Sequence, residues 1–378
     1  MMKRPHVCFV GEGESFFDLL TEKVGGRAAG AAVQQKLIAQ GLRRLGYEIT
    51  FLVSDYGQPD VVTTSDGINL VKTRPSPVKE SFIRRMTGLM RLFRVTNRVN
   101  PDICYQQARQ AITGVMALNC RLRGHPFVYS VASNTDLDIA KRFELGFPDW
   151  RIYRYGLTMA TEIVAQSEDQ MNTLKEDFGR QGVLIQSTFT KPDESEKNLE
   201  KRHILWVGNL RKVRRPEMFL EVAERLPEYK FVLVGGKYPG QESLFDQIAE
   251  RAGSIPHLEM AGAVDYDDVG RYFSEAFLFV NTTLVEGFPN TYLQAWCRGV
   301  PVVGTFDADG LIAKHGLGRA CSSVDELVDG VRDFMKDDAP RMSAGEKALN
   351  YVEANHSEAA VVGAYDRLFM RLYESSPA

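Results

Sequence analysis

Short apolar runs and helical segments alternate along this chain, and this alternation restricts the possible folds more than any other feature. The runs are rich in β-branched and aromatic residues, and the segments between them place apolar residues every three or four positions. In the first half, strands are expected at residues 6–10, 48–54, 102–107, 126–132 and 162–167. This order is typical of strand–helix–strand units, whose parallel sheet is covered by helices on both faces.

The alternation stops and then starts again. Residues 191–202 (KPDESEKNLEKR) contain eight charged positions and are predicted to be a linker. A second series follows, with strands expected at residues 203–208, 230–236, 257–264, 277–283 and 300–305. We therefore predict an α/β protein of two Rossmann-like, doubly wound domains, residues 1–190 and 203–358, that face each other across a cleft. A last helix at about residues 359–378 is expected to return to the first domain.

Charge and composition exclude several classes of protein. The 378 residues carry a net charge of −3, with 44% apolar and 25% charged residues, which is the average of soluble globular proteins. Disordered chains, collagens and disulfide-stapled miniproteins are excluded, and so is an overall basic field for nucleic acid. The near-neutral total conceals a charge of +5 on residues 1–190 and of −8 on residues 191–378.

Cysteine usage favours a reducing compartment. The five cysteines are odd in number and scattered, without a Cys-x-x-Cys pair, so neither a zinc site nor a disulfide framework is expected. The amino-terminal residues lack the apolar core of a secretion signal, and no apolar run approaches the ~20 residues of a membrane span. We expect a cytoplasmic protein.

Residues 286–303 (EGFPNTYLQAWCRGVPVV) predict a ligand site. A strand ends just before this stretch, a glycine–proline turn follows, and a helix is expected to begin near Asn290. Amides at the start of a helix can bind anionic oxygens. Phosphate oxygens suit these amides, whereas the Glu286 carboxylate suits neutral hydroxyl groups. This division fits a sugar attached to a diphosphate, although Glu286 in a solvated turn is the plainer alternative.

A second strand end, at residues 206–217, carries four closely spaced cations. They are Arg211, Lys212, Arg214 and Arg215. Cations fixed at this place can stabilise the charge that grows on a departing diphosphate without a metal ion. Because one diphosphate does not need all four, Arg215 is the first candidate and Arg211 the second, and the others are expected in solvent.

Residues 206–236 and 280–304 resemble the nucleotide-binding domain of the retaining, GT-B-fold glycosyltransferases of sequence family four (glycosyl transferases group 1). In the first half, the glycine-rich stretch 25–35 resembles the family's amino-terminal loop. The resemblance implies transfer of a sugar from a nucleotide diphosphate sugar, a UDP- or GDP-sugar first, to a glycan or lipid-linked acceptor in polysaccharide or glycolipid biosynthesis. It implies neither a cofactor nor a metal.

The resemblance also implies roles for single residues. The candidate catalytic residues are Arg215, at the position of the family's diphosphate-binding lysine, Arg211, and Glu286, which would bind a hydroxyl of the donor sugar. The candidate donor-binding residues are Gly26, Gly208, Asn209, Lys212, Val264, Gly287, Phe288, Pro289, Asn290, Thr291 and Gln294.

The sequence departs from the family pattern at three places. Gln294 replaces the glutamate that usually binds the ribose, and its amide can still bond a diol without the charge. Asn209 stands where many members have an arginine, so Arg211 or Lys212 must take part of the phosphate contact. The histidine that often follows the N-domain strand is missing from residues 132–134. A catalytic role for that loop therefore stays open.

Two further stretches have competing interpretations. Gly11 begins a partial dinucleotide fingerprint that lacks its third glycine, and Glu12 and Glu14 would repel a pyrophosphate, so a structural turn is expected rather than a dehydrogenase site. Residues 82–98 predict an amphipathic helix. Its apolar face is expected to contain Phe82, Met86, Leu89, Met90 and Phe93, opposite Arg84, Arg91 and Arg98. Such a helix either contacts an anionic membrane peripherally or packs on the sheet.

Two other functions stay open. A sugar-nucleotide epimerase of the same fold would need a converging acid and base, and the sequence offers no obvious pair; proton–deuterium exchange at a sugar carbon would reveal one. A non-catalytic nucleotide-sugar sensor is suggested by Gln294 and by the missing histidine. Slow hydrolysis of a donor without an acceptor would argue against a sensor.

Overall fold

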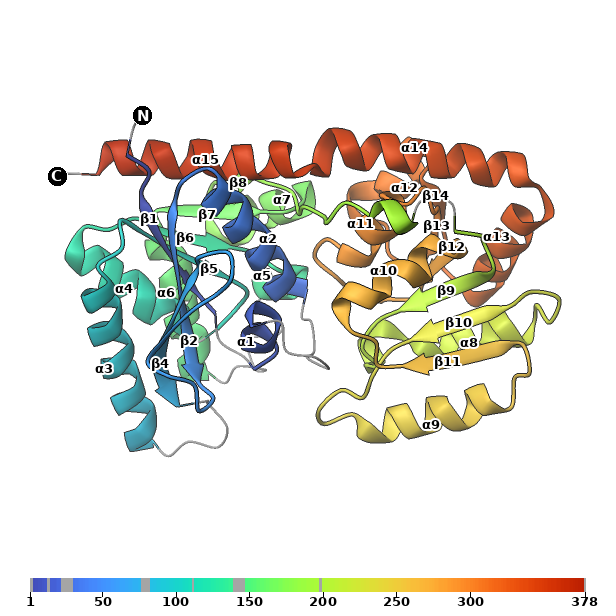
Figure 1. The fold of residues 1–378 in the computed structure, drawn as a ribbon, viewed down its shortest axis with the longest axis horizontal. Coiled ribbons are helices and arrows are strands. Elements are labelled where there is room, and N and C mark those ends of the chain that lie inside the picture. The colour runs from blue at the N-terminus through green and yellow to red at the C-terminus, as the bar shows by residue number, and fades with distance from the viewer. Residues whose placement is uncertain are drawn as a thin grey trace. The chain divides into compact units, whose positions relative to one another are not determined.

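A computed structural model describes residues 3–11, 14–21, 30–75, 82–110, 112–138, 147–196 and 199–376 of the chain (Figure 1). The chain divides into two compact units, one made of Met1–Thr188 with Glu358–Ala378 and the other of Phe189–Ser357. Each unit is built on one sheet of mainly parallel strands. The predicted α/β class is confirmed.

In the first unit, the described strands form a sheet in the order β3-β4-β2-β1-β5-β6-β7-β8. They are β1 (His6–Val10), β2 (Glu48–Asp55), β3 (Val61–Thr63), β4 (Asn69–Pro75), β5 (Ile103–Gln107), β6 (Phe127–Ser130), β7 (Glu162–Ala165) and β8 (Val183–Leu184). The hairpin of β3 and β4 is antiparallel, and β1, at the centre, pairs in parallel with β2 and β5.

Helices cover both faces of this sheet because side chains of a strand alternate between its two faces. The helices of this unit are α1 (Glu14–Leu20), α2 (Gly30–Arg44), α3 (Phe82–Val99), α4 (Ile112–Arg123), α5 (Asn134–Leu137), α6 (Phe147–Met159), α7 (Glu168–Phe178) and α15 (Glu358–Ser375). In β1, Val7 and Phe9 join the core under α2 and α15, whereas Cys8 and Val10 join the core under α3, α4 and α6.

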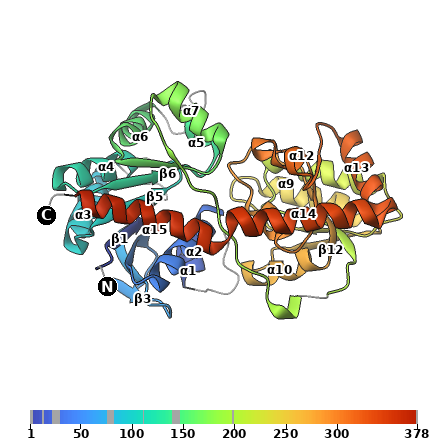
Figure 2. The same cartoon turned by 90° about the horizontal axis from the view of Figure 1, so that it is seen from above.

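The last helix, α15, belongs to the first unit although it follows the second in sequence. It lies against α2 (Figure 2). The Tyr47 hydroxyl donates to the Asp366 carboxylate over 2.6 Å, and Arg4 pairs with the same carboxylate at 2.5 Å. Burial and this carboxylate raise the pKa of Tyr47 above its ordinary value. The core under α15 receives Val361, Val362, Tyr365, Leu368, Phe369 and Leu372.

The described side chains of α3, from residue 87 onward, pack on the sheet through a face centred on Leu92. Leu92 is 1% exposed and joins the core with Leu89 and Val95 beside it, whereas Met90 is 55% exposed. Met90 was expected on the same apolar face as Leu89 but does not lie on the face that packs on the sheet, because the buried positions follow the helical period through residue 92. Arg94 and Arg98 are exposed. The side chains of Phe82 and Met86 lie outside the described part.

In the second unit, the described strands form a parallel sheet in the order β11-β10-β9-β12-β13-β14. They are β9 (His203–Val207), β10 (Phe231–Val234), β11 (Leu258–Gly262), β12 (Ala276–Asn281), β13 (Val302–Gly304) and β14 (Gly318–Ala320). From β9 the chain builds the sheet outward on one side through β10 and β11, and then crosses back to build the other side from β12. The strand order therefore reverses between β9 and β12.

Helices and short 3₁₀ turns surround this second sheet. The helices are α8 (Pro216–Glu224), α9 (Glu242–Gly253), α10 (Tyr266–Ser274), α11 (Asn290–Trp296), α12 (Leu311–His315), α13 (Val324–Lys336) and α14 (Asp338–His356). One core lies under α8, α9 and α13, and the other under α10, α11, α12 and α14. The 3₁₀ turns are η2 (Glu194–Glu196), η3 (Lys212–Arg214) and η4 (Ala308–Gly310).

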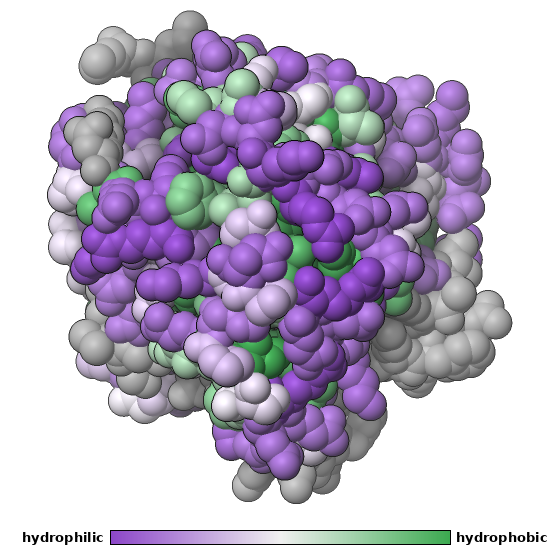
Figure 3. Space-filling model, turned by 90° about the vertical axis from the view of Figure 1, so that its right-hand side faces the viewer, coloured by the Kyte–Doolittle hydropathy of each residue, from purple (hydrophilic) through white to green (hydrophobic). Residues whose placement is uncertain are grey.

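The visible surface is mostly polar. On the face that Figure 3 shows, hydrophobic residues stand in small groups among hydrophilic ones. Within the described ranges, every helix is too short or too polar to cross a membrane.

Candidate functional site

The two loops that carry the predicted donor residues follow β9 and β12, the strands between which the order reverses. In open parallel sheets, ligands bind at the carboxyl ends of the strands at such a reversal. Hydrogen bonds join the loops: the Leu284 amide donates to the Val213 carbonyl over 2.9 Å, and the Thr282 hydroxyl donates to the Arg214 carbonyl over 2.7 Å. The Trp206 indole N–H donates to the same Thr282 hydroxyl over 3.0 Å. The sheet thereby fixes both loops together.

Arg214 and Glu286 form a two-point ion pair across these loops. One guanidinium nitrogen donates to Oε1 of Glu286 over 2.9 Å, and another contacts Oε2. About a fifth of each side chain is exposed, at 22% for Arg214 and 21% for Glu286. Burial raises the pKa of Glu286 above its ordinary value, and Arg214 and then Arg211 oppose this rise. The positive charges of both arginines therefore act on this carboxylate.

Arg215 is occupied in a different way. It follows η3 with a φ of +47°, in the left-handed region, and serves as the N-cap residue of α8. Its guanidinium donates to the carbonyls of Thr282 and Thr283 over 2.7 and 3.2 Å and to the Thr305 hydroxyl over 2.7 Å. Burial lowers the pKa of Arg215 from its ordinary value. Its charge therefore braces the loop after β12.

The remaining residues of the first loop lie around this pair. The Arg211 guanidinium lies 4.5 Å from the centre of the Tyr238 ring, and its Nε is buried without a hydrogen-bond partner among the described residues. The Lys212 side chain is exposed, and its amide donates to Gln241 over 2.7 Å. Asn209 is exposed, and the Gly208 amide donates to the Val234 carbonyl over 3.0 Å.

The second loop leads into α11 and contains most of the predicted donor contacts. Gly287 and Pro289 are buried, and the Phe288 ring packs in the core, with its centre 4.8 Å from the centre of the His356 ring. The helix starts at Asn290. Two buried side-chain oxygens, Oγ1 of Thr291 and Oε1 of Gln294, have no hydrogen-bond partner among the described residues.

The last two predicted donor residues lie farther from these loops in sequence. Val264 is half-buried just after β11 and packs against the core under α10 and α11. Gly26 lies outside the described residues.

The carboxyl ends of β1 and β5 mark the corresponding reversal in the first unit. Ala108 follows β5 with a φ of +74°, a strained conformation for a residue with a side chain. Around it, the carboxamide oxygens of Gln106, Gln107 and Gln110 are buried without hydrogen-bond partners in the described structure. The sequence analysis missed these glutamines, whose only signal is their place at the carboxyl end of a buried strand and just after it.

Two other stretches singled out in the sequence of the first unit make contacts that support its fold. A Cβ added to Gly11 would lie 2.3 Å from the Phe16 ring, so the glycine permits close packing at the end of β1. In the loop at residues 132–136, the Asp136 carboxylate accepts the Ala132 and Ser133 amides and closes the start of α5. Burial raises the pKa of Asp136. Among the described residues, no group of three or more His, Cys, Asp or Glu side chains is arranged to hold a metal ion.

Two family models together match most of the chain. The model described as glycosyl transferases group 1 matches residues 187–351, and that of the glycosyl transferase 4-like domain matches residues 29–185. The Vi polysaccharide biosynthesis protein VipC/TviE of Salmonella typhi is 29% identical over 127 residues, which are 34% of this chain and 19% of that protein. One subunit of the human phosphatidylinositol N-acetylglucosaminyltransferase is 27% identical over 85 residues, 22% of this chain and 17% of that protein. The matches thus span less than a fifth of either relative.

Solved structures share the fold over nearly the whole chain. Sucrose-phosphate synthase from Thermosynechococcus elongatus has a TM-score of 0.80 at 14% identity, over 99% of this chain and 100% of that chain. Alr3699/HepE of Anabaena, solved with UDP and glucose, has a TM-score of 0.74 at 12% identity, over 97% and 100%. The predicted GT-B fold is confirmed. With its two Rossmann-like units and both family matches, the chain belongs to the group 1 glycosyl transferases.

Proposed function

We propose that this chain transfers a sugar from a nucleotide diphosphate sugar to an acceptor hydroxyl, with retention of the anomeric configuration and without a metal ion. The observation that supports this most is the Arg214–Glu286 ion pair, with Arg211 beside it, at the reversal between β9 and β12. Fixed cations suit a diphosphate, and an adjacent carboxylate suits sugar hydroxyls. The site therefore offers groups for both partners of the bond to be broken, the sugar and the diphosphate.

In the proposed reaction, the bond between the anomeric carbon and the diphosphate oxygen breaks while the acceptor oxygen bonds to the same carbon. The acceptor proton passes to the leaving diphosphate oxygen on the same face of the sugar. Arg214 and Arg211 stabilise the negative charge that grows on this oxygen, and Glu286 holds a donor hydroxyl. Because arginine supplies this charge, turnover is expected to persist in EDTA.

Arg215 has a positioning role in this proposal. The sequence pattern makes it the first candidate for the diphosphate, but its guanidinium donates to two carbonyls and a hydroxyl of the β12 and β13 loops. Arg214, one of the two cations expected in solvent, instead lies against Glu286. We therefore assign stabilisation of the leaving group to Arg214 and retain Arg211 as its partner.

A UDP-sugar is the first candidate donor. A solved structure of the same fold, Alr3699/HepE of Anabaena, contains UDP and glucose, and this supports UDP over GDP. The buried, unpartnered oxygens of Gln294 and Thr291 offer hydrogen bonds near the loop amides. A carboxamide can bind a ribose diol, although more weakly than a carboxylate does.

The acceptor is proposed to be a growing or lipid-linked glycan that binds through the first unit. Buried carboxamide oxygens of Gln106, Gln107 and Gln110 can accept hydrogen bonds from neutral sugar hydroxyls. The relatives act in polysaccharide biosynthesis and on phosphatidylinositol by name. A peripheral membrane contact through residues 82–98 stays a separate hypothesis, and co-sedimentation with anionic and neutral liposomes tests it.

A thermal-shift panel of UDP-, GDP-, ADP- and CMP-sugars tests donor binding. A ligand at 100 times its Kd adds ~2.7 kcal/mol to the free energy of unfolding, which is readily detected. The UDP-sugar that binds is then incubated with acceptors, and NMR of the product reports the anomer. A flat panel contradicts the proposal, and an inverted product contradicts the retaining mechanism alone.

A further inference from the structure

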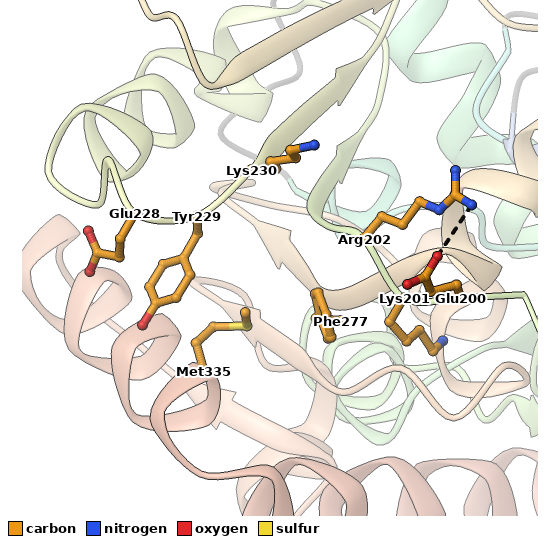
Figure 4. Close-up of a pocket in the computed structure, with 8 residues that line it drawn as sticks. All are labelled: Glu200, Lys201, Arg202, Glu228, Tyr229, Lys230, Phe277 and Met335. Carbon is orange, nitrogen blue, oxygen red and sulfur yellow. Dashed lines mark hydrogen bonds and ion pairs between the residues drawn. The ribbon is translucent and has the colours of Figure 1, made fainter.

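A pocket of about 550 Å³ lies in the second unit, at the edge of the sheet opposite the candidate donor site (Figure 4). Its lining residues precede or begin β9, β10 and β12 or come from α13. They are Glu200, Lys201, Arg202, Glu228, Tyr229, Lys230, Phe277 and Met335. Because the strands are parallel, their amino ends share this edge, and the Arg214–Glu286 pair lies at the other. At ~3.3 Å per residue, β9 alone separates the two edges by about 16 Å.

Lys201 is the unusual residue of this pocket. Its side chain is half-buried, yet it makes no hydrogen bond or ion pair with any residue that the structure describes. The charged groups that act on it are Arg298 and Arg341, and each has its own carboxylate: Arg298 pairs with Glu196 at 2.7 Å, and Arg341 pairs with Asp338. Burial and these two arginines lower the pKa of Lys201 to about 8. A buried cation without a counter-ion is costly.

The other charges of the pocket do not compensate Lys201. Arg202 pairs with Glu200 at 3.5 Å, and the side chains of Lys230 and Glu228 are both exposed to solvent. In Figure 4, Glu228 lies with Tyr229 on one side of Phe277, and Lys201, Arg202 and Glu200 lie on the other. Lys201 is therefore the partly buried cation of this pocket that no described carboxylate pairs, and a phosphate monoester carries a charge of the opposite sign at neutral pH.

Apart from Glu228, the opposite wall is apolar. Tyr229, Phe277 and Met335 present ring and thioether surface to the pocket, and Arg341 backs the Phe277 ring, with its guanidinium carbon 4.8 Å from the ring centre. A pocket of this volume accommodates a small metabolite rather than a bare ion. The lining therefore fits a ligand with an anionic end and a compact organic part.

We propose that this pocket binds a small phosphorylated metabolite of the hexose phosphate class, with its phosphate against Lys201 and Lys230 and its organic part against Tyr229, Phe277 and Met335. The site is independent of the donor site and does not rest on the proposed transfer reaction. Occupancy supplies the missing counter-charge at the start of β9.

Isothermal titration with glucose 6-phosphate, inorganic phosphate and glucose tests this assignment. Glucose 6-phosphate is expected to bind and to raise the melting temperature, inorganic phosphate to bind at least tenfold more weakly, and glucose not at all. Lys201→Met is expected to weaken binding at least tenfold. Lys201→Arg, whose charge is permanent, should retain binding, and Lys347→Met, at an exposed position on α14, should match the wild type.

The pH profile and the donor site provide independent checks. Wild-type affinity should fall as the pH rises through about 8, whereas that of Lys201→Arg should not. The titrations are repeated on Arg214→Ala, which removes the donor-site cation. The proposal is overturned if glucose 6-phosphate does not bind, or if Lys201→Met and Lys347→Met bind it with equal affinity. It is also overturned if Arg214→Ala loses binding while Lys201→Met retains it. If inorganic phosphate binds as tightly as glucose 6-phosphate, the apolar wall does not contribute to binding of the organic part.

Discussion

Two consecutive arginines of the donor loop have different surroundings because of one backbone angle. Arg214 ends the turn η3 and pairs with Glu286, whereas Arg215, at a φ of +47°, turns its guanidinium onto the carbonyls after β12. The left-handed conformation of Arg215 thus directs its guanidinium group to the loop, whereas the guanidinium group of Arg214 is placed where it can contact substrate. Composition alone does not distinguish them.

Arg214→Ala and Arg215→Ala should therefore fail in different ways. Loss of Arg214 is expected to lower kcat about 10²- to 10³-fold because it removes charge stabilisation, and it also leaves the Glu286 carboxylate without its ion-pair partner. Loss of Arg215 leaves two carbonyls and a hydroxyl without donors and should lower the free energy of unfolding by about 1–3 kcal/mol. Steady-state kinetics and urea unfolding measure the two effects. A larger loss of turnover in a stable Arg215→Ala protein would reverse the assignment.

Lys201 predicts a stability that depends on pH. Its folded pKa of about 8 lies below the value of the unfolded chain, ~10.4. Between these values the unfolded chain binds more protons, so stability rises with pH there, and the penalty of the buried charge is complete below pH 8. Without phosphate, Lys201→Met should raise the free energy of unfolding at pH 7 by about 1–2 kcal/mol and lose this gain near pH 10.4.

Urea unfolding of Lys201→Met at several pH values measures this difference. Lys347→Met, at an exposed position on α14, serves as the control. Equal stability of the two variants at pH 7 would show that Lys201 is solvated.

At the scale of elements, the contact of α2 with α15 depends on a glycine. A Cβ added to Gly41 would lie 2.4 Å from Cγ2 of Val362, so Gly41→Ala should force the helices apart and cost about 1–3 kcal/mol in urea unfolding. A Cβ added to Gly363 on α15 would lie 3.5 Å from the Arg367 guanidinium, an ordinary contact, so Gly363→Ala should instead stabilise its helix by up to about 1 kcal/mol. The same sign for both variants would contradict this packing.

Much of the fold could be predicted because buried parallel strands have a strong sequence signal. The runs that became β1, β9 and β12 are mostly apolar and buried. The hairpin of β3 and β4 was missed because Val61–Thr63 is short and not buried, so it lacks that signal. In the donor loops, the turn and Glu286 could be predicted. Which of Arg214 and Arg215 is available to the diphosphate depends on the left-handed conformation of Arg215, and the sequence gives no sign of it because no glycine stands there.

At the scale of the whole molecule, the first unit depends on the end of the chain. Six apolar side chains of α15 enter its core, each worth about 1.5–3 kcal/mol when fully buried. Their sum is comparable with the total stability of a domain, about 5–15 kcal/mol. Deletion of residues 358–378 should therefore unfold the first unit while the second, residues 189–357, keeps its sheet. Hydrogen exchange resolved by peptide measures this, and protection retained in β1 would contradict it.

The return of α15 has a consequence during translation. The ribosome makes the strands of the first unit early and completes the second unit before the residues of α15 emerge. Until then, the apolar faces of α2, β1 and β5 that α15 covers stay open to solvent or to chaperones. The first unit is thus synthesised before the second but can finish folding only after it. The uncovered apolar surface of the first unit exposes the nascent chain to aggregation.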